Sequence, residues 1–311
     1  MSDAPINKLY NNIMKFFETT NPHSKILLKR YVEDGKLNPE IIIEEGRELI
    51  KFPFVNLKTN QITIQSTYLS HLWAFIYSVF VIYEEAIQKK LLDKTFTGQI
   101  DLDSDLLKRA NLLLSWSMSL KTTYSDWDTT LPNPDIDYSE QNSETYYIEK
   151  INNLFQSSVS FLLYHEVAHV VNGHKSYYFG FDKLNNYDDI KELEKEADDF
   201  AFNTLIYDDN EKNKIEKGLS IMIVFCSAFM LTPHHSLSQK KHPDIDQRLL
   251  TIINKLNFEK IENEFYIYYL GSYILQMYLQ KEEEPILSGI YDNHKELFYL
   301  YLDQIDNIKK L

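Results

Sequence analysis

The feature that most constrains this chain is an apolar segment that carries two histidines and a glutamate. Residues 161–174 read FLLYHEVAHVVNGH, which sets His165, Glu166 and His169 among Leu, Val and Ala. Burying imidazole and carboxylate groups costs free energy unless each group finds a polar partner. A fold that takes this segment into its core must therefore supply that partner.

The spacing of the two histidines indicates that the partner is a metal ion. On a helix, residues four apart lie on one face, so the rings of His165 and His169 point toward the same place. Glu166 lies about 100° further round the helix, at the edge of that face. This HExxH arrangement is typical of zinc peptidases, in which two neutral imidazoles bind Zn²⁺ and the glutamate reaches the open side of the ion.

A third zinc ligand is expected from the acidic segment ELEKEADDFAFNTLI at residues 192–206. On a helix, Glu194 and Asp198 share one stripe with two alanines, which would let another helix approach closely. Glu192 and Glu196 would point well away from that stripe. Glu194 is therefore the predicted ligand, and Asp198 is predicted to accept a hydrogen bond from a ligand histidine. The alternative interpretation is a solvated acidic helix face.

An HExxH helix followed by an ExxxD helix resembles the gluzincin zinc peptidases, and five residues carry the resemblance: His165, Glu166, His169, Glu194 and Asp198. The segments HEVAHVVNGH and EKEAD are similar to the Ste-type CAAX-protease and heat-shock membrane-protease superfamily. EKEADDFAFNTLI also resembles the ImmA/IrrE peptidases. A chain of 311 residues with HExxH near its middle resembles, in addition, the phage-exclusion proteases of the Lit type.

A downstream segment, KKHPDIDQRLL at residues 240–250, resembles the His-Pro and Arg element of the Ste-type superfamily. The resemblance assigns His242 to stabilising the tetrahedral oxyanion and gives Arg248 a supporting role, either at the oxyanion or in an ion pair. A proline in the first turn of a helix and a surface arginine would explain the same residues without catalysis. That superfamily also has a strand pair before its helices, which makes Asn56 the candidate substrate-binding residue.

His174 is predicted to support the metal site without binding the ion. Metzincins take a third histidine ligand six residues after the second, whereas His174 follows His169 by five residues. Its position near the expected end of the helix favours a capping role or a contact with a ligand.

The rest of the sequence predicts a mainly α fold of the α+β class: a zincin-like catalytic core with the active-site helix, a small β-hairpin or sheet, and surrounding helices. Alternating apolar residues around KTNQ predict the hairpin at 54–65. Helices are expected near 6–50, 68–93, 104–122, 146–173, 190–207, 212–231 and 243–256, with a helical tail over 259–311. Three regions follow: a helical N-terminal region, 1–130, whose hairpin would complete the catalytic sheet; a zinc peptidase core, 145–256; and a C-terminal helical region, 257–311.

Composition excludes some partners. The formal net charge of −14 argues against nucleic acid, because binding phosphates requires clustered Lys and Arg. Cys226 is the one cysteine, which excludes an internal disulfide and a Cys-based zinc site and fits a cytoplasmic location. The apolar runs at 72–83 and 219–231 are too short to cross a bilayer, so buried helices are expected there. Peripheral membrane association stays open.

The predicted function is hydrolysis of peptide bonds in a protein substrate by a zinc-dependent metalloendopeptidase, with Glu166 as the general base. The Lit-type resemblance implies a latent bacterial anti-phage or stress-response protease with a translation factor as a candidate substrate. A substrate strand is expected to add to a sheet edge such as 61–65. The alternative is a catalytically silent scaffold or partner-binding sensor in which zinc only staples helices together. A purely structural site would not need Glu166.

Overall fold

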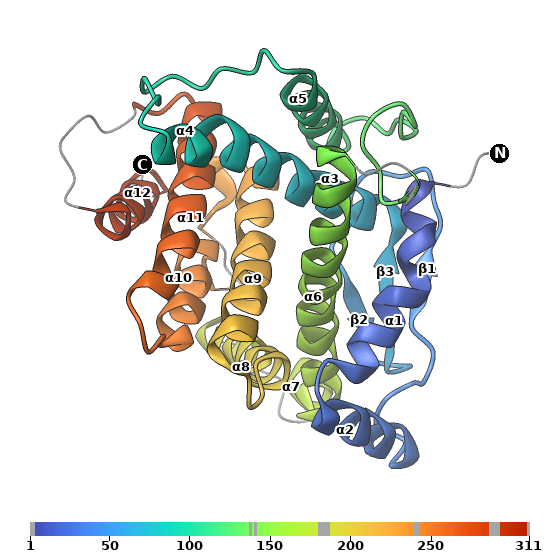
Figure 1. Ribbon diagram of the computed structural model, residues 1–311. Coiled ribbons are helices and arrows are strands. Elements are labelled where there is room, and N and C mark those ends of the chain that lie inside the picture. The colour runs from blue at the N-terminus through green and yellow to red at the C-terminus, as the bar shows by residue number, and fades with distance from the viewer. Residues whose placement is uncertain are drawn as a thin grey trace.

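The computed structural model describes residues 4–136, 139, 142–179, 187–238, 243–285 and 293–309, and Figure 1 shows their arrangement. The strands are β1 Ile42–Glu44, β2 Phe54–Asn56 and β3 Gln61–Gln65. The α-helices are α1 Tyr10–Thr19, α2 Pro22–Glu33, α3 Ser66–Ile82, α4 Lys89–Leu92, α5 Asp105–Ser119, α6 Ser143–Val171, α7 His174–Phe179, α8 Tyr187–Leu205, α9 Glu211–Leu231, α10 Ile245–Leu256, α11 Glu262–Lys281 and α12 His294–Ile308. Two short 3₁₀ helices, Pro5–Leu9 and His234–Ser236, and a π-helical turn, Tyr83–Gln88, complete the described elements. The mainly α prediction is confirmed.

Helix α6 runs through the middle of the molecule and packs against α1, α3, α8 and α9 (Figure 1). It begins where the side chain of Asn142 accepts a hydrogen bond from the Thr145 N–H, which satisfies one of the free donors of the first turn. Its second half is apolar on most sides and is correspondingly buried on most sides. This burial encloses the HExxH segment within the packed helices.

The two apolar runs are buried core helices, as predicted. Helix α3 is buried along nearly its whole length and contacts α5 and α6, and α9 carries the run at 219–231. No described helix is long and apolar enough to span a membrane. One hydrophobic cluster contains buried residues from Ile6 to Ile308. Packing alone therefore does not divide the chain into the three predicted regions, and their boundaries stay a prediction.

The hairpin is confirmed, and a third strand joins it. β2 pairs antiparallel with β3, with Val55 opposite Ile62, and β1 pairs parallel with β3, with Ile43 opposite Ile64. The helix expected to reach residue 50 was wrong, because three consecutive isoleucines after Pro39 favour an extended backbone. The expected substrate edge at 61–65 was also wrong, since β3 is the central strand; the outer strand beside α6 is β2.

Lys309, just after α12, is fastened to the start of α10. The Lys309 ammonium lies 2.9 Å from Asp244 and 2.8 Å from both Asp246 and Asp306. Burial alone would lower the pKa of Lys309, but hydrogen bonds to the three carboxylates outweigh it and raise the pKa above its usual value. These ion pairs join the last described turn of the chain to the helix that carries Arg248.

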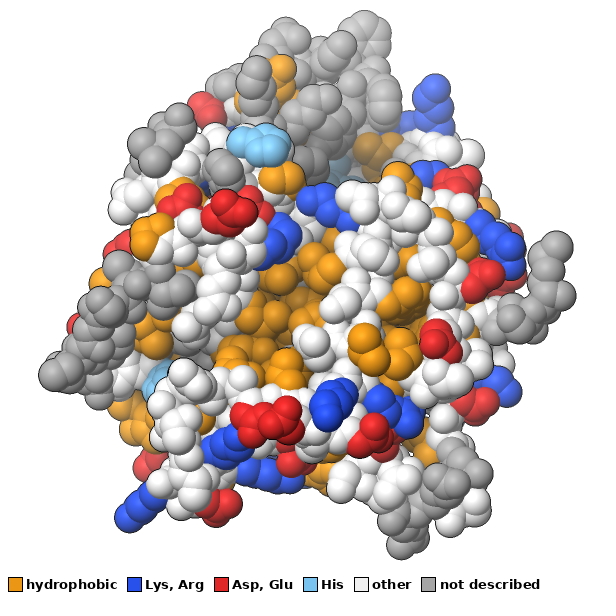
Figure 2. All heavy atoms as spheres, turned by 90° about the horizontal axis from the view of Figure 1, so that it is seen from above, with side chains coloured by type: hydrophobic (Ala, Val, Ile, Leu, Met, Phe, Trp, Pro, Cys, Tyr) orange, Lys and Arg blue, Asp and Glu red, His pale blue; other side chains and the backbone are white. Residues whose placement is uncertain are grey.

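Seen from the side where α3, α4 and α5 lie, the molecule has a hollow with a hydrophobic floor and charged side chains on its rim (Figure 2). The HExxH end of α6 is at the opposite end of that helix from Ser143, near α7 and α8 (Figure 1).

Candidate metal centre

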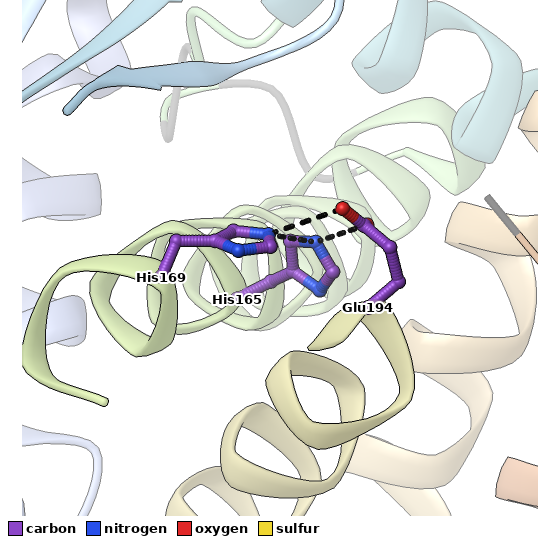
Figure 3. A group of neighbouring side chains, drawn as sticks. All are labelled: His165, His169 and Glu194. Atoms are coloured by element: carbon purple, nitrogen blue, oxygen red, sulfur yellow. Dashed lines mark hydrogen bonds and ion pairs between the residues drawn. The ribbon is translucent and has the colours of Figure 1, made fainter. Parts of the chain in front are cut away.

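Helices α6 and α8 bring three potential metal ligands together. His165 and His169 project from α6, and Glu194 from α8 turns its carboxylate toward both rings (Figure 3). All three side chains are buried. Ala197 and Ala201 are fully buried on α8, and their small side chains allow α8 to lie close to α6. The predicted set of ligands therefore converges.

The distances between the ligand atoms suit a tetrahedral zinc site. The two Nε2 atoms lie 3.2 Å apart, and the Glu194 carboxylate oxygens lie 3.4 Å from Nε2 of His165 and 3.7 Å from Nε2 of His169. Zn–N and Zn–O bonds of about 2.0–2.2 Å at tetrahedral angles place ligand atoms about 3.3–3.6 Å apart. Within the described ranges, these residues are the one His, Cys, Asp and Glu group that could hold a metal ion.

A carboxylate and an arginine orient the first histidine. The Asp198 carboxylate lies 2.9 Å from Nδ1 of His165 and accepts two hydrogen bonds of 2.7 Å from the Arg248 guanidinium. The guanidinium also lies over the Phe225 ring, 5.1 Å from its centre. Nδ1 is therefore occupied, and Nε2 of His165 faces the other ligands. The structure thus brings Asp198 and Arg248 beside the metal position.

His174 occupies the corresponding place at the second histidine. Its Nδ1 lies 2.8 Å from Nδ1 of His169, and its side chain is completely buried. The contact depends on Gly173, whose φ of +75° reverses the chain after α6. This reversal returns His174 over the helix end, which the regular spacing of a helix would not do for residues five apart.

Glu166 lies near strand β2, where the Val55 backbone is in polar contact with its carboxyl group. Burial, and then repulsion from Glu194, raise the pKa of Glu166 to about 7, although the charges of His165 and Arg248 and the contact with the Val55 backbone act in the opposite direction. A carboxyl group with such a pKa can take up and release a proton near neutral pH.

The buried carboxylates of Glu194 and Asp198 stabilise positive charge at this centre. Burial would lower the pKa of His165, but its contacts with Asp198 and Glu194 raise it to about 10. Burial and the neighbouring His165 charge lower the pKa of His169 to about 3. The Arg248 charge overcomes burial and holds the pKa of Asp198 at about 2. The buried carboxylates thus stabilise positive charge at the histidine pair, and a bound metal ion could supply that charge.

Two further residues were predicted to take part in the site. His242 lies outside the described residues. Asn56 closes the hairpin turn, where its side-chain oxygen accepts the Lys58 N–H at 3.0 Å. Its exposed side chain lies next to Val55, and its role in binding substrate stays a prediction.

Two contacts were not predicted from the sequence. The Val55 contact with Glu166 joins residues far apart in the chain, and no local pattern indicates it. The proximity of Glu196 to His174, at 3.4 Å, arises because Gly173 reverses the chain. The positive φ expected of a glycine after a long helix was the signal for this second contact.

Comparisons with known proteins identify similar peptidases. A family model described as Peptidase U49 matches residues 62–270, more than half of the chain. A cell death peptidase of Escherichia coli (strain K12) is 23% identical over 256 residues, which cover 81% of this chain and 82% of that protein. No solved structure matches. The matched region contains the three converging ligands and Arg248.

Proposed function

This chain belongs to the peptidase U49 family, and from that membership and the three buried ligand atoms we propose that it is a zinc-dependent endopeptidase. The observation that carries the proposal is the tetrahedral spacing of those atoms with Glu166 one residue away on the same helix. Hydrolysis of a protein substrate agrees with the family and with the similar cell death peptidase.

His165, His169 and Glu194 would hold the zinc ion, and two features of the chain prepare them to do so. Their ligand atoms already lie 3.2–3.7 Å apart, and Asp198 keeps the His165 ring oriented. When bound, zinc supplies Lewis-acid polarisation of the scissile carbonyl and lowers the pKa of a water molecule toward ~7.

Glu166 is the proposed general base and acid. It takes a proton from the attacking water as the water oxygen bonds to the scissile carbonyl carbon. It then delivers that proton to the amine nitrogen as the C–N bond breaks. The pKa of about 7 suits both transfers, because the group must accept and release a proton in one cycle. A zinc site that only stapled helices would not need this carboxyl group.

The substrate is proposed to lie as an extended strand beside β2. This strand is on the outside of the sheet and contacts α6, and its Val55 backbone already points at Glu166. Adding a strand there would place main-chain carbonyls of the substrate near the base. Asn56 at the end of β2 is the proposed substrate contact, and the resemblance to Ste-type proteases makes His242 the proposed oxyanion donor.

The biological setting is proposed from resemblance. The Lit-type likeness supports a cytoplasmic, latent anti-phage or stress-response protease, and it makes a translation factor the first substrate to examine. The name of the similar E. coli protein, a cell death peptidase, agrees with a protease whose action affects its own cell. Peripheral membrane association is a separate proposal, which flotation of the purified protein with lipid vesicles tests; a protein that stays at the bottom of the gradient contradicts it.

The experiment that tests the function compares the wild-type chain with Glu166→Gln in a bacterial host. Proteome-wide mapping of new peptide termini should find cleavage products only with the wild type, while zinc analysis of both purified proteins should give one ion per chain. If both proteins bind zinc and neither generates new termini, with or without phage infection, the result favours the silent scaffold or partner-binding sensor.

A further inference from the structure

We infer that Glu196 and His174 are positioning residues for the second histidine ligand, which they hold with its Nε2 directed at the metal position. The inference rests on the proposed zinc site. Three side chains in series, His169, His174 and Glu196, would then connect the buried metal position to the surface of the molecule.

The first contact fixes the proton of His169. A contact of 2.8 Å between the Nδ1 atoms of His169 and His174 requires that one of them donates and the other accepts. Nε2 of His169 faces His165 and Glu194, and it must carry no proton if it is to bind a metal ion. The His169 proton is therefore on Nδ1, and Nδ1 of His174 accepts it.

The second contact follows from the first. Because Nδ1 of His174 accepts, the His174 proton is on Nε2, inside a side chain with no exposed surface. A buried N–H needs an acceptor, and the acceptor nearest to this one is the Glu196 carboxylate at 3.4 Å. That distance is long for a hydrogen bond, and Nε2 has no hydrogen-bond partner among the described residues. A small movement of the Glu196 side chain completes the series.

The third contact holds Glu196 in place. The Asn172 amide donates a hydrogen bond of 2.8 Å to the other oxygen of the same carboxylate. Asn172 ends α6 and Glu196 belongs to α8, so the carboxylate links the two helices that supply the zinc ligands. Glu196 is about half exposed, unlike the buried Asp198 that serves His165. The two ligand histidines are thus oriented by different means.

The test measures zinc affinity by competition with a chelator and records the visible spectrum of the Co²⁺-substituted protein. His174→Leu removes the acceptor for His169 and should weaken zinc binding by about 10- to 100-fold. His174→Gln keeps an acceptor and should recover most of that loss. Glu196→Gln should weaken binding less than His174→Leu but measurably, with a shifted Co²⁺ spectrum. Glu192→Gln is the matched control, because Glu192 is an exposed residue of the same helix that pairs with Lys195.

The outcomes separate this inference from the proposed function. If the wild type binds one zinc ion tightly and Glu196→Gln matches Glu192→Gln in affinity and spectrum, the inference is wrong and the proposed function stands. If the wild type binds no zinc, the proposed site itself fails. Should His174→Leu not fold, Glu196→Gln still decides, because an exposed substitution leaves the core intact.

Discussion

The backbone of Val55 lies close enough to the carboxyl group of Glu166 to lower its pKa, so the outer strand of the sheet meets the helix that carries the candidate metal ligands. Residues more than a hundred positions apart therefore share one polar contact at the place where a substrate would lie. This contact makes Glu166 the natural starting point for experiments.

Replacing Glu166 with Gln should abolish proteolysis and leave zinc binding intact, since the amide cannot accept the water proton. General base catalysis contributes about 10²- to 10⁴-fold, so kcat/KM should fall at least that far. The measurement is kcat/KM for cleavage of the substrate that the mapping of new peptide termini identifies. Glu149→Gln is the matched control, because Glu149 is an exposed residue of the same helix. A Glu166→Gln protein that cleaves at the wild-type rate would show that another group is the base.

Replacing Arg248 with Met should destabilise the protein strongly, because the buried Asp198 carboxylate loses both hydrogen bonds and the charge of the guanidinium and keeps only the His165 ring as a partner among the described residues. Breaking a buried ion pair by removing one partner costs about 3–5 kcal/mol, and urea unfolding measures the loss. Arg47→Met provides the comparison: Arg47 pairs with Asp126 at the surface, and the free energy of unfolding should change by less than about 1 kcal/mol. Equal losses in the two variants would contradict the role given to Arg248.

Removing zinc should lower the thermal stability, because the proposed ligands hold the ion between two separate helices of the folded chain. At a free zinc concentration about 100 times Kd, binding stabilises the folded state by about 2.7 kcal/mol. Differential scanning calorimetry with and without a chelator measures this effect. His169→Ala removes one ligand and should largely eliminate the difference. A chelator that lowers the Tm of both proteins equally would indicate that the ion binds elsewhere.

The Lys309 cluster predicts a stability change at alkaline pH. The pKa of Lys309 is higher in the folded state than in the unfolded chain, so its stabilising contribution is complete below the unfolded value of about 10.4 and is lost as the pH rises through the folded value. The free energy of unfolding should therefore be higher for the wild type than for Lys309→Met. This difference should be constant up to about pH 10 and should decrease above it. Urea titrations at several pH values measure the difference, and a difference that stays the same at high pH would refute the prediction.

The parts of the site that lie on regular helices could be predicted from the sequence. His165 and His169 are one turn apart, and Glu194 and Asp198 are one turn apart, so helical periodicity alone placed each pair on one face. The two pairs meet because α6 and α8 pack together. Ala197 and Ala201, on the same stripe as Glu194 and Asp198, indicated this close packing.

The parts that depend on irregular or distant backbone could not be predicted in the same way. Whether β3 lies at the centre or the edge of a sheet depends on β1, a three-residue strand with little pattern of its own. The position of His174 depends on one left-handed residue, Gly173, because a regular helix would have directed the ring elsewhere. Glu196 was not expected among the metal ligands, and that reasoning gave no hint of its contact with His174.

The ion pairs of Lys309 connect the segment after α12 to the helix that carries Arg248. Helix α10 receives the Lys309 ammonium at one end and, one turn further on, carries the guanidinium that steadies Asp198. Loss of Lys309 by proteolysis would remove these ion pairs and loosen α10, while the side chains of the candidate metal centre would all remain. A cut at this position would therefore weaken the candidate metal centre from a distance.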